Sequence, residues 1–217
     1  MKQIENKNTY IRNSDRHRDS LIWLLCLLTV DSGRVYGVDI SELAHYECEE
    51  NLFTEISLGK VHLMPSSVEH IPLNSNSIDK AFSCNSFYFW PSIPKGCTEL
   101  HRLLKPGAPL LTVQNIDSVL KRKKAGGFEQ ANVDFVAFIL TLEKVGFVDV
   151  KMEYHTDEAT GKNYEVIRAT ASWWPNSKEW HYSLLTVELC VYYGVWDAMN
   201  ADRKTGASYN KQTFGRY

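Results

Sequence analysis

From residue 34 to residue 145 the chain alternates short apolar stretches with amphipathic ones, and this order restricts the fold more than any other feature. The apolar stretches that we expect to form strands are 34–39, 60–64, 80–85 and 110–113. Between them, Ser41 is a favourable N-cap for a helix over 42–52, and Ser92 opens a second helix that 105–107 ends. This alternation predicts an α/β fold with a mostly parallel sheet.

The pattern changes after a further apolar helix, expected over 132–145 and closed by Gly146. Apolar and polar residues then alternate over 148–154 and again over 164–171, with a polar loop that contains Gly161 between them. Alternation of this kind is typical of strands with one solvated face. We therefore predict that a long antiparallel hairpin completes a three-layer α/β fold.

The length of the chain limits its domain organisation, and its charge limits the classes of partner that it can bind. A domain of about 150 residues is common, so a chain of 217 residues predicts one domain with additions. We divide it into a polar segment over 1–14, the α/β domain over 15–171 and an appended tail over 172–217. The formal net charge is −2, which gives no electrostatic case for nucleic acid or an anionic membrane surface as partner.

The cysteines and the apolar runs indicate a cytoplasmic protein. The five cysteines lie far apart, without the close spacing of a metal site or a disulfide framework. No signal peptide opens the chain, and the longest apolar run, 21–30, is half the length of about 20 residues that a membrane helix needs. We therefore expect no metal, no membrane span and a cytoplasmic location.

Asp39, the residue that ends the first expected strand, is the first candidate for a functional side chain. Open α/β sheets bind ligands at the carboxyl ends of their strands, and a carboxylate there can accept hydrogen bonds from both hydroxyls of a ribose. The alternative is that Asp39 caps the helix that follows, where a negative charge is favourable. The sequence leaves both interpretations open.

Four stretches resemble class I S-adenosylmethionine-dependent methyltransferases of the type 11 group. The first, 33–41, is similar to that family's second strand and its acidic loop. The second, 68–83, is similar to "AE-x-LPF … SFD-x-VFS", and the third, 85–91, to the loop after the next strand in enzymes that act on small molecules. The fourth, 99–107, is similar to "E-x-x-R-x-LKPGG". The resemblance covers 33–171 and implies a Rossmann-like methyltransferase fold.

The resemblance also implies a site and a reaction. The residues expected to bind S-adenosylmethionine are Gly37, Asp39, Ile40, Ser67, Val68, Cys84 and Asn85. Asp39 would hold the ribose, Ser67 and Val68 the adenine, and Cys84 with Asn85 the methionine part. Tyr88 and Trp90 would line the side of a small-molecule acceptor, with core packing as the alternative. No catalytic base is named, because transfer from an activated sulfonium depends chiefly on placing the acceptor.

One feature of the family is absent from this sequence. Its members open with a strand and a Gly-x-Gly loop at the centre of the sheet, whereas none of the 12 glycines here forms Gly-x-Gly. The residues that precede Gly33 instead suggest the helix that follows this loop. We therefore expect an N-terminally incomplete domain whose central gap closes up, is filled by another segment, or marks an incomplete chain product.

The tail over 172–217 holds four of the six tryptophans. Trp180, Leu184, Val187, Val191 and Val195 recur at helical spacing, which predicts an amphipathic helix within 177–199. This helix would pack on the chain's own domain or dock a partner protein.

Two other functions stay open beside methyl transfer. The first is a non-catalytic, methyltransferase-like module for binding or interaction, since the Gly-rich loop is missing. The second is a nucleotide-dependent oxidoreductase, although its fingerprint requires a Gly-rich turn as well.

Overall fold

The computed structural model describes residues 33–127, 131–158, 161–173 and 187–192. Its strands are β1 Arg34–Asp39, β2 Val61–Pro65, β3 Lys80–Cys84, β4 Pro109–Gln114, β5 Phe147–Thr156, β6 Asn163–Ala171 and β7 Val187–Tyr192. Its helices are α2 Glu42–Asn51, α3 Phe53–Ser57, the 3-10 turn η1 Phe87–Phe89, α4 Ile93–Leu103, α5 Ile116–Lys124 and α6 Phe135–Val145. The alternation of strands and helices expected from the sequence is confirmed, with element ends shifted by a few residues.

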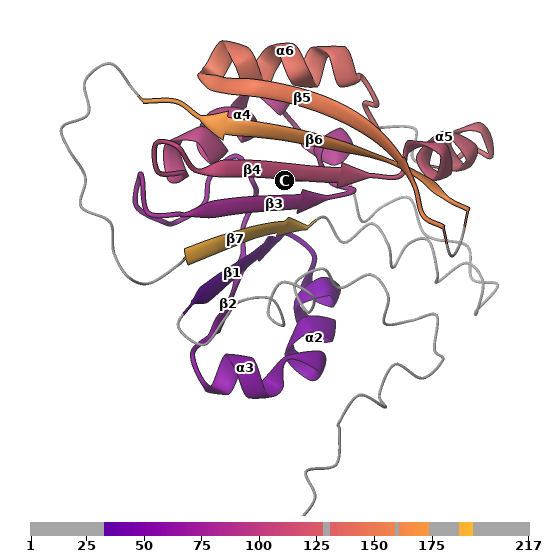
Figure 1. Cartoon of the computed structure of the whole chain (residues 1–217). Coiled ribbons are helices and arrows are strands. Elements are labelled where there is room, and N and C mark those ends of the chain that lie inside the picture. The colour runs from indigo at the N-terminus through magenta and orange to yellow at the C-terminus, as the bar shows by residue number, and fades with distance from the viewer. Residues whose placement is uncertain (1–32, 128–130, 159–160, 174–186, 193–217) are drawn as a thin grey trace, which may run out of the picture.

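The strands form one seven-stranded sheet in the order β2-β1-β7-β3-β4-β6-β5 (Figure 1). The pairs from β2 to β4 are all parallel, whereas β6 runs antiparallel to both β4 and β5. The expected mostly parallel sheet with a terminal antiparallel hairpin is therefore confirmed.

Strand β7 occupies the centre of this sheet, between β1 and β3. Val191 is in register with Val38 on one side and with Ser83 on the other. The sequence predicted a gap at the centre of the sheet, between the strands that became β1 and β3. The segment 187–192, more than 100 residues later in the chain than β3, fills this gap. Of the three outcomes left open, the structure shows the filling by another segment.

The helix predicted within 177–199 is wrong over 187–192, since these residues form β7. Apolar residues at i and i+4 fit a helix, but a short apolar run is equally compatible with a buried strand. Here the open position between two parallel strands offers hydrogen-bond partners on both sides, which favours the strand. The remainder of the predicted helix, and the helix expected over 15–30, lie outside the described residues.

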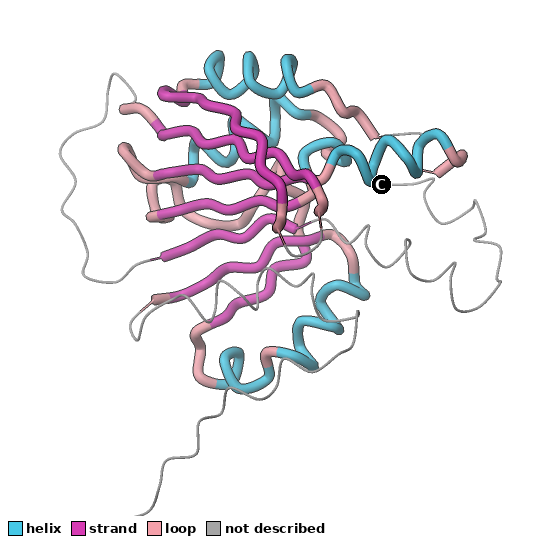
Figure 2. Tube along the Cα trace, turned by 45° about the vertical axis from the view of Figure 1, so that its right-hand side comes forward, coloured by secondary structure: helices cyan, strands magenta, loops and turns pink. Residues whose placement is uncertain are grey.

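Two hydrophobic clusters show that helices cover both faces of the sheet. Ala81 and Phe82 are neighbours on β3, so their side chains point to opposite faces. Ala81 packs in the large cluster with residues of α4 and α6, whereas Phe82 packs with Cys48 and Leu52 beside α2. Figures 1 and 2 show α6 beside β5 and the α2–α3 pair beside β1 and β2. The expected three layers are confirmed.

The helix ends follow the local sequence. Ser41 Oγ accepts a hydrogen bond from the Ala44 N–H at 3.3 Å, as expected of an N-cap, and Ser92 Oγ accepts from Lys95 N–H at 3.4 Å. The basic run 121–124 forms the last turn of α5. Positive charges are favourable there, because the carbonyl end of a helix carries a partial negative charge. No helix in the described ranges is long and apolar enough to cross a membrane.

Candidate functional site

The carboxyl ends of β1, β7 and β3 meet at one edge of the sheet (Figure 1). Asp39 is the last residue of β1, and Cys84 is the last of β3. One strand, β7, separates them, so two strand spacings of about 4.8 Å place their backbones roughly 10 Å apart. Residues far apart in sequence are thus brought together at the position where open α/β sheets bind ligands.

Asp39 is 4% exposed, and its carboxylate organises the turn into α2. Oδ1 accepts a hydrogen bond from the Ser41 N–H at 2.8 Å, and the N-cap of α2 is Ser41 itself. The Asp39 carbonyl accepts from the Ser66 N–H at 3.1 Å and lies 2.9 Å from His45 Nε2. Asp39 is therefore not the helix cap that the sequence offered as an alternative to a ligand-binding role.

The Ser66 contact brings the segment 66–70 against the end of β1. Within it, the Ser67 carbonyl accepts from the His70 N–H at 3.0 Å, and Ser67 Oγ accepts from the Glu69 N–H at 3.2 Å. Val68 is buried, whereas Ile40, which follows Asp39, is 48% exposed. The structure thus gathers the residues assigned to ribose and adenine around one strand end, with Gly37 two residues before it.

Asn85 joins the carboxyl ends of β3 and β4. Its Oδ1 accepts hydrogen bonds from the Asn115 N–H at 2.9 Å and from the Tyr88 hydroxyl at 3.2 Å, and its N–H donates to the Val113 carbonyl at 2.9 Å. Its φ of 47° lies in the left-handed region, which Asn tolerates better than most residues. The residue before it, Cys84, is buried.

The aromatic residues after Asn85 lie in the core. The Phe87 ring stacks on Phe138 with centroids 4.3 Å apart, and the Trp90 ring meets Phe138 edge-on at 5.8 Å. Tyr88 and Trp90 are 2% and 5% exposed. Burial raises the pKa of the Tyr88 phenol above its ordinary value, so this hydroxyl keeps its proton. Core packing, the alternative that the sequence left open for this run, describes the geometry of these side chains.

The family model of the methyltransferase domain matches residues 22–112. These residues include Asp39, the 66–70 segment and Asn85. The chain is thus similar to the methyltransferase domain family over 91 of its 217 residues. No curated protein sequence resembles the chain closely enough to count as a match.

Solved structures share the fold of this chain. A SAM-dependent methyltransferase from Aquifex aeolicus is 24% identical, with a TM-score of 0.55 over 69% of this chain and 75% of that one. An arsenic(III) S-adenosylmethionine methyltransferase from Chlamydomonas reinhardtii is 17% identical, with a TM-score of 0.53 over 73% and 61%. A methyltransferase structure from Bacillus halodurans is 11% identical, with a TM-score of 0.52 over 71% and 99%.

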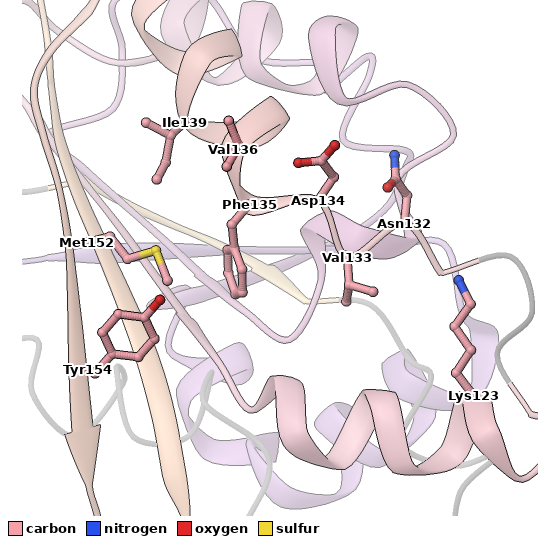
Figure 3. Close-up of a pocket in the computed structure, with 9 residues that line it drawn as sticks. All are labelled: Lys123, Asn132, Val133, Asp134, Phe135, Val136, Ile139, Met152 and Tyr154. Atoms are coloured by element: carbon pink, nitrogen blue, oxygen red, sulfur yellow. The ribbon is translucent and has the colours of Figure 1, made fainter.

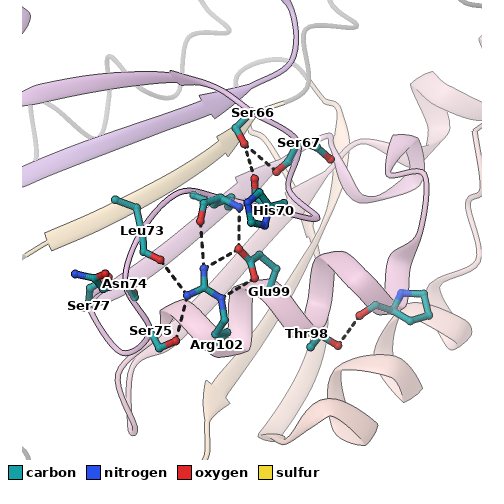
Figure 4. Close-up of polar contacts among 12 residues, drawn as sticks. Ser66, Ser67, His70, Leu73, Asn74, Ser75, Ser77, Thr98, Glu99 and Arg102 are labelled. Carbon is teal, nitrogen blue, oxygen red and sulfur yellow. Dashed lines mark hydrogen bonds and ion pairs between the residues drawn. The ribbon is translucent and has the colours of Figure 1, made fainter. Parts of the chain in front are cut away.

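Sequence reasoning on the site missed two carboxylates and an arginine. Glu99 and Arg102 of α4 form hydrogen bonds to each other and to the backbone of 71–73 (Figure 4). Glu165, at the start of β6, is 8% exposed, and its Oε2 accepts from the Ile116 N–H at 3.2 Å. Burial raises the pKa of Glu165 above its ordinary value. The spacing of Glu99 and Arg102 was visible in the sequence, whereas nothing in a strand's alternation singles out Glu165.

Two cavities open on the described part of the chain. The larger, about 640 Å³, lies between the end of α5, the start of α6 and β5 (Figure 3). It is lined by Lys123, Asn132, Val133, Asp134, Phe135, Val136, Ile139, Met152 and Tyr154. The other, about 560 Å³, lies beside Tyr46 and Phe53. Neither cavity is lined by Asp39 or Asn85. Among the described residues, no three His, Cys, Asp or Glu side chains are grouped so as to hold a metal ion.

Proposed function

We propose that the protein binds S-adenosylmethionine and transfers its methyl group to a small-molecule acceptor. The observation that carries this proposal is the position of Asp39 and Asn85 on either side of β7, at the carboxyl edge of the sheet. The cofactor supplies an activated methyl group, so the work of the protein is to bind both partners and to align them.

The residues at this edge have side chains of the chemical types that would bind the cofactor. The Asp39 carboxylate carries two acceptor oxygens, which suit the paired hydroxyls of a ribose. It would hold the ribose hydroxyls, while the exposed Ile40 would pack on the adenine. Ser67 and Val68 would contact the adenine edge, and Cys84 with Asn85 the methionine part. Tyr88, through its hydrogen bond to Asn85, would fix that amide rather than touch the acceptor itself.

A non-catalytic methyltransferase-like module is the second candidate, and one observation favours it. Asp39 is 4% exposed, and neither described cavity touches it. A carboxylate this buried offers little accessible surface to a cofactor. We prefer methyl transfer to the oxidoreductase that the sequence left open, because the matched family model is that of a methyltransferase domain.

We also propose that the protein works in the cytoplasm. Cys97 is a buried free thiol, and free thiols are typical of a reducing compartment.

Calorimetric titration with S-adenosylmethionine and with S-adenosylhomocysteine tests the proposal. We expect a Kd below about 100 μM, weakened by a factor of ten or more in Asp39→Asn, because the ribose loses a charge-assisted hydrogen bond. Asp149→Asn is the matched control: Asp149 is exposed, and its φ of 53° suits Asn equally well. No heat at millimolar ligand would favour the non-catalytic module.

Transfer itself is tested with methyl-labelled cofactor. We expect label to appear in compounds of low molecular mass when the protein is incubated with a deproteinised cell extract, and Asp39→Asn to reduce this label. Label found only in protein or nucleic acid would contradict a small-molecule acceptor.

A further inference from the structure

We propose that Glu99 and Arg102 are a positioning pair that holds the adenine-side segment 66–70 in its binding geometry. This inference rests on the proposed function, since it assigns the pair a task in cofactor recognition. Neither side chain is expected to touch the cofactor. The pair would act through the backbone of 71–75, which follows the segment directly.

The connection between β2 and β3 makes such a device necessary. It starts at the carboxyl edge of the sheet, after Pro65, and returns to the amino edge at Lys80. Such crossovers between parallel strands are usually built around a helix. Here 66–79 contains no helix, so its backbone groups need partners from elsewhere.

Helix α4 supplies these partners through Glu99 and Arg102 (Figure 4). Glu99 Oε1 accepts a hydrogen bond from the Ile71 N–H at 2.7 Å. Arg102 Nη2 donates to the Ile71 carbonyl at 3.1 Å, and Nη1 donates to the Leu73 carbonyl at 2.9 Å and to Ser75 Oγ at 3.1 Å. Both backbone polar groups of Ile71 are therefore held by one ion pair.

The ion pair is itself rigid. Arg102 Nε donates to Glu99 Oε2 at 2.7 Å, and Nη2 donates to Oε1 at 2.7 Å, which is the two-pronged geometry of a guanidinium on a carboxylate. Burial by itself would raise the pKa of Glu99, but the hydrogen bonds from Arg102 and from the Ile71 N–H outweigh it, and the pKa is lowered. Glu99 thus stays ionised at neutral pH, and the pair stays formed.

The hydrogen bonds of one short turn connect Ile71 to Ser67. Ser66 Oγ donates to the His70 carbonyl at 2.5 Å, and the His70 N–H donates to the Ser67 carbonyl at 3.0 Å. The Ile71 side chain is 1% exposed, which fixes the end of this turn in the core. A shift at Ile71 would therefore move Ser67 and Val68, whose hydroxyl and N–H are expected to meet the adenine edge.

Only arginine can make this set of bonds. Its planar guanidinium presents donors in a fixed fork, and Arg102 uses Nε, Nη1 and Nη2 at once. A lysine keeps the charge but has one nitrogen on a flexible stem. Arg102→Lys therefore retains the attraction to Glu99 while it releases the backbone of 71–73.

The chain offers a matched control at the other end of the same connection. Lys105 Nζ donates to Asp79 Oδ1 at 2.8 Å, which anchors the last residue before β3. This ion pair joins α4 to the connection just as Arg102 does, but on the amino side of the sheet. Lys105→Ala should lower stability without changing recognition of the adenine.

The test compares affinities for S-adenosylhomocysteine and for its 6-oxo analogue, S-inosylhomocysteine, which lacks the purine amino group. We expect the unaltered protein to prefer the adenine compound by about tenfold, the equivalent of one hydrogen bond. The preference should fall below about threefold in Arg102→Lys and persist in Lys105→Ala. If Arg102→Lys fails to fold, Glu99→Gln, which keeps the side-chain shape, is expected to lose the preference in its place.

Each contrary outcome has a separate meaning. If the unaltered protein binds neither compound, the proposed function is overturned and this inference with it. If the unaltered protein discriminates and folded Arg102→Lys discriminates equally well, the positioning role alone is overturned. A loss of discrimination in Lys105→Ala as large as in Arg102→Lys would also overturn it, because general loosening would then explain the effect.

Discussion

Cys190 of β7 lies in backbone register with Phe82 of β3. Neighbouring strands lie about 4.8 Å apart, within the Cα separation that a disulfide accepts. We therefore predict that Phe82→Cys forms a disulfide with Cys190 under mild oxidation, detected by mass spectrometry of peptides from the unreduced protein. Phe82→Ser is the control and should form none. A folded Phe82→Cys protein without this link would contradict the position of β7.

Gly146 ends α6 at a φ of +114°, and a Cβ built there would lie 2.8 Å from His101 Nε2. Gly146→Ala should therefore lower the free energy of unfolding by about 2–4 kcal/mol, from backbone strain together with the clash. Gly59→Ala is the matched control, because Gly59 has a φ of +67° and open space around its Cα. Its loss should be about 1 kcal/mol. Denaturant titrations of the two variants measure these losses. Equal losses in the free energy of unfolding would show that the His101 side chain moves aside without an energetic penalty.

His101 predicts a pH dependence of stability. Its side chain is buried, and its ring meets Phe147 edge-on at 5.1 Å. Burial lowers the pKa of His101 in the folded protein, although a hydrogen bond with the Gly146 backbone opposes this. The unfolded chain, with a histidine pKa of about 6.5, therefore takes up a proton at higher pH than the folded protein does.

The stability that neutral His101 provides should thus be complete above about pH 6.5 and should decrease as the pH falls below it. Denaturant titrations between pH 8 and pH 5 should show this slope for the unaltered protein and a shallower one for His101→Phe. The same slope in both proteins would assign the effect to other groups. Glu99, whose pKa is lowered, acts in a different window, because its contribution is lost only as the pH falls below about 4.3.

Asn85 predicts a coupling between the ends of β3 and β4. Asn85→Ala removes the oxygen that accepts hydrogen bonds from the Asn115 N–H and the Tyr88 hydroxyl. It also places alanine at a left-handed φ of 47°, which alanine tolerates less well than asparagine does. We expect a loss of about 2–3 kcal/mol in the free energy of unfolding. Asn85→Asp keeps an acceptor and should lose less. A loss as large in Asn85→Asp would show that the amide nitrogen, rather than Oδ1, carries the effect.

Local patterns predicted the parts of the fold that local chemistry determines. Ser41 and Ser92 cap the helices expected of them, and Gly146 ends α6, because each of these roles depends on residues within one turn. The same logic found Asp39, since a polar residue at the end of a buried strand is visible in sequence. Its 4% exposure was not, because burial depends on what packs over it.

Features that depend on distant partners were beyond such patterns. The spacing of Val187 and Val191 suits a helix, and only the vacant position between β1 and β3 selects a strand. Arg102 belongs to a motif that the sequence analysis quoted, yet its task became visible only through contacts with Ile71, Leu73 and Ser75, some 30 residues earlier in the chain. The sequence around α4 gives no indication of those contacts.

Hydrogen–deuterium exchange of the full chain, with and without 1 mM S-adenosylhomocysteine, tests the central claim most directly. The account predicts slower exchange in peptides that cover 37–45, 66–70 and 84–90, where Asp39, Ser67 and Asn85 would surround one ligand. The same experiment on Asp39→Asn should show little of this protection. Protection confined to the cavity between α6 and β5, or no change anywhere, would contradict the assignment of the cofactor site.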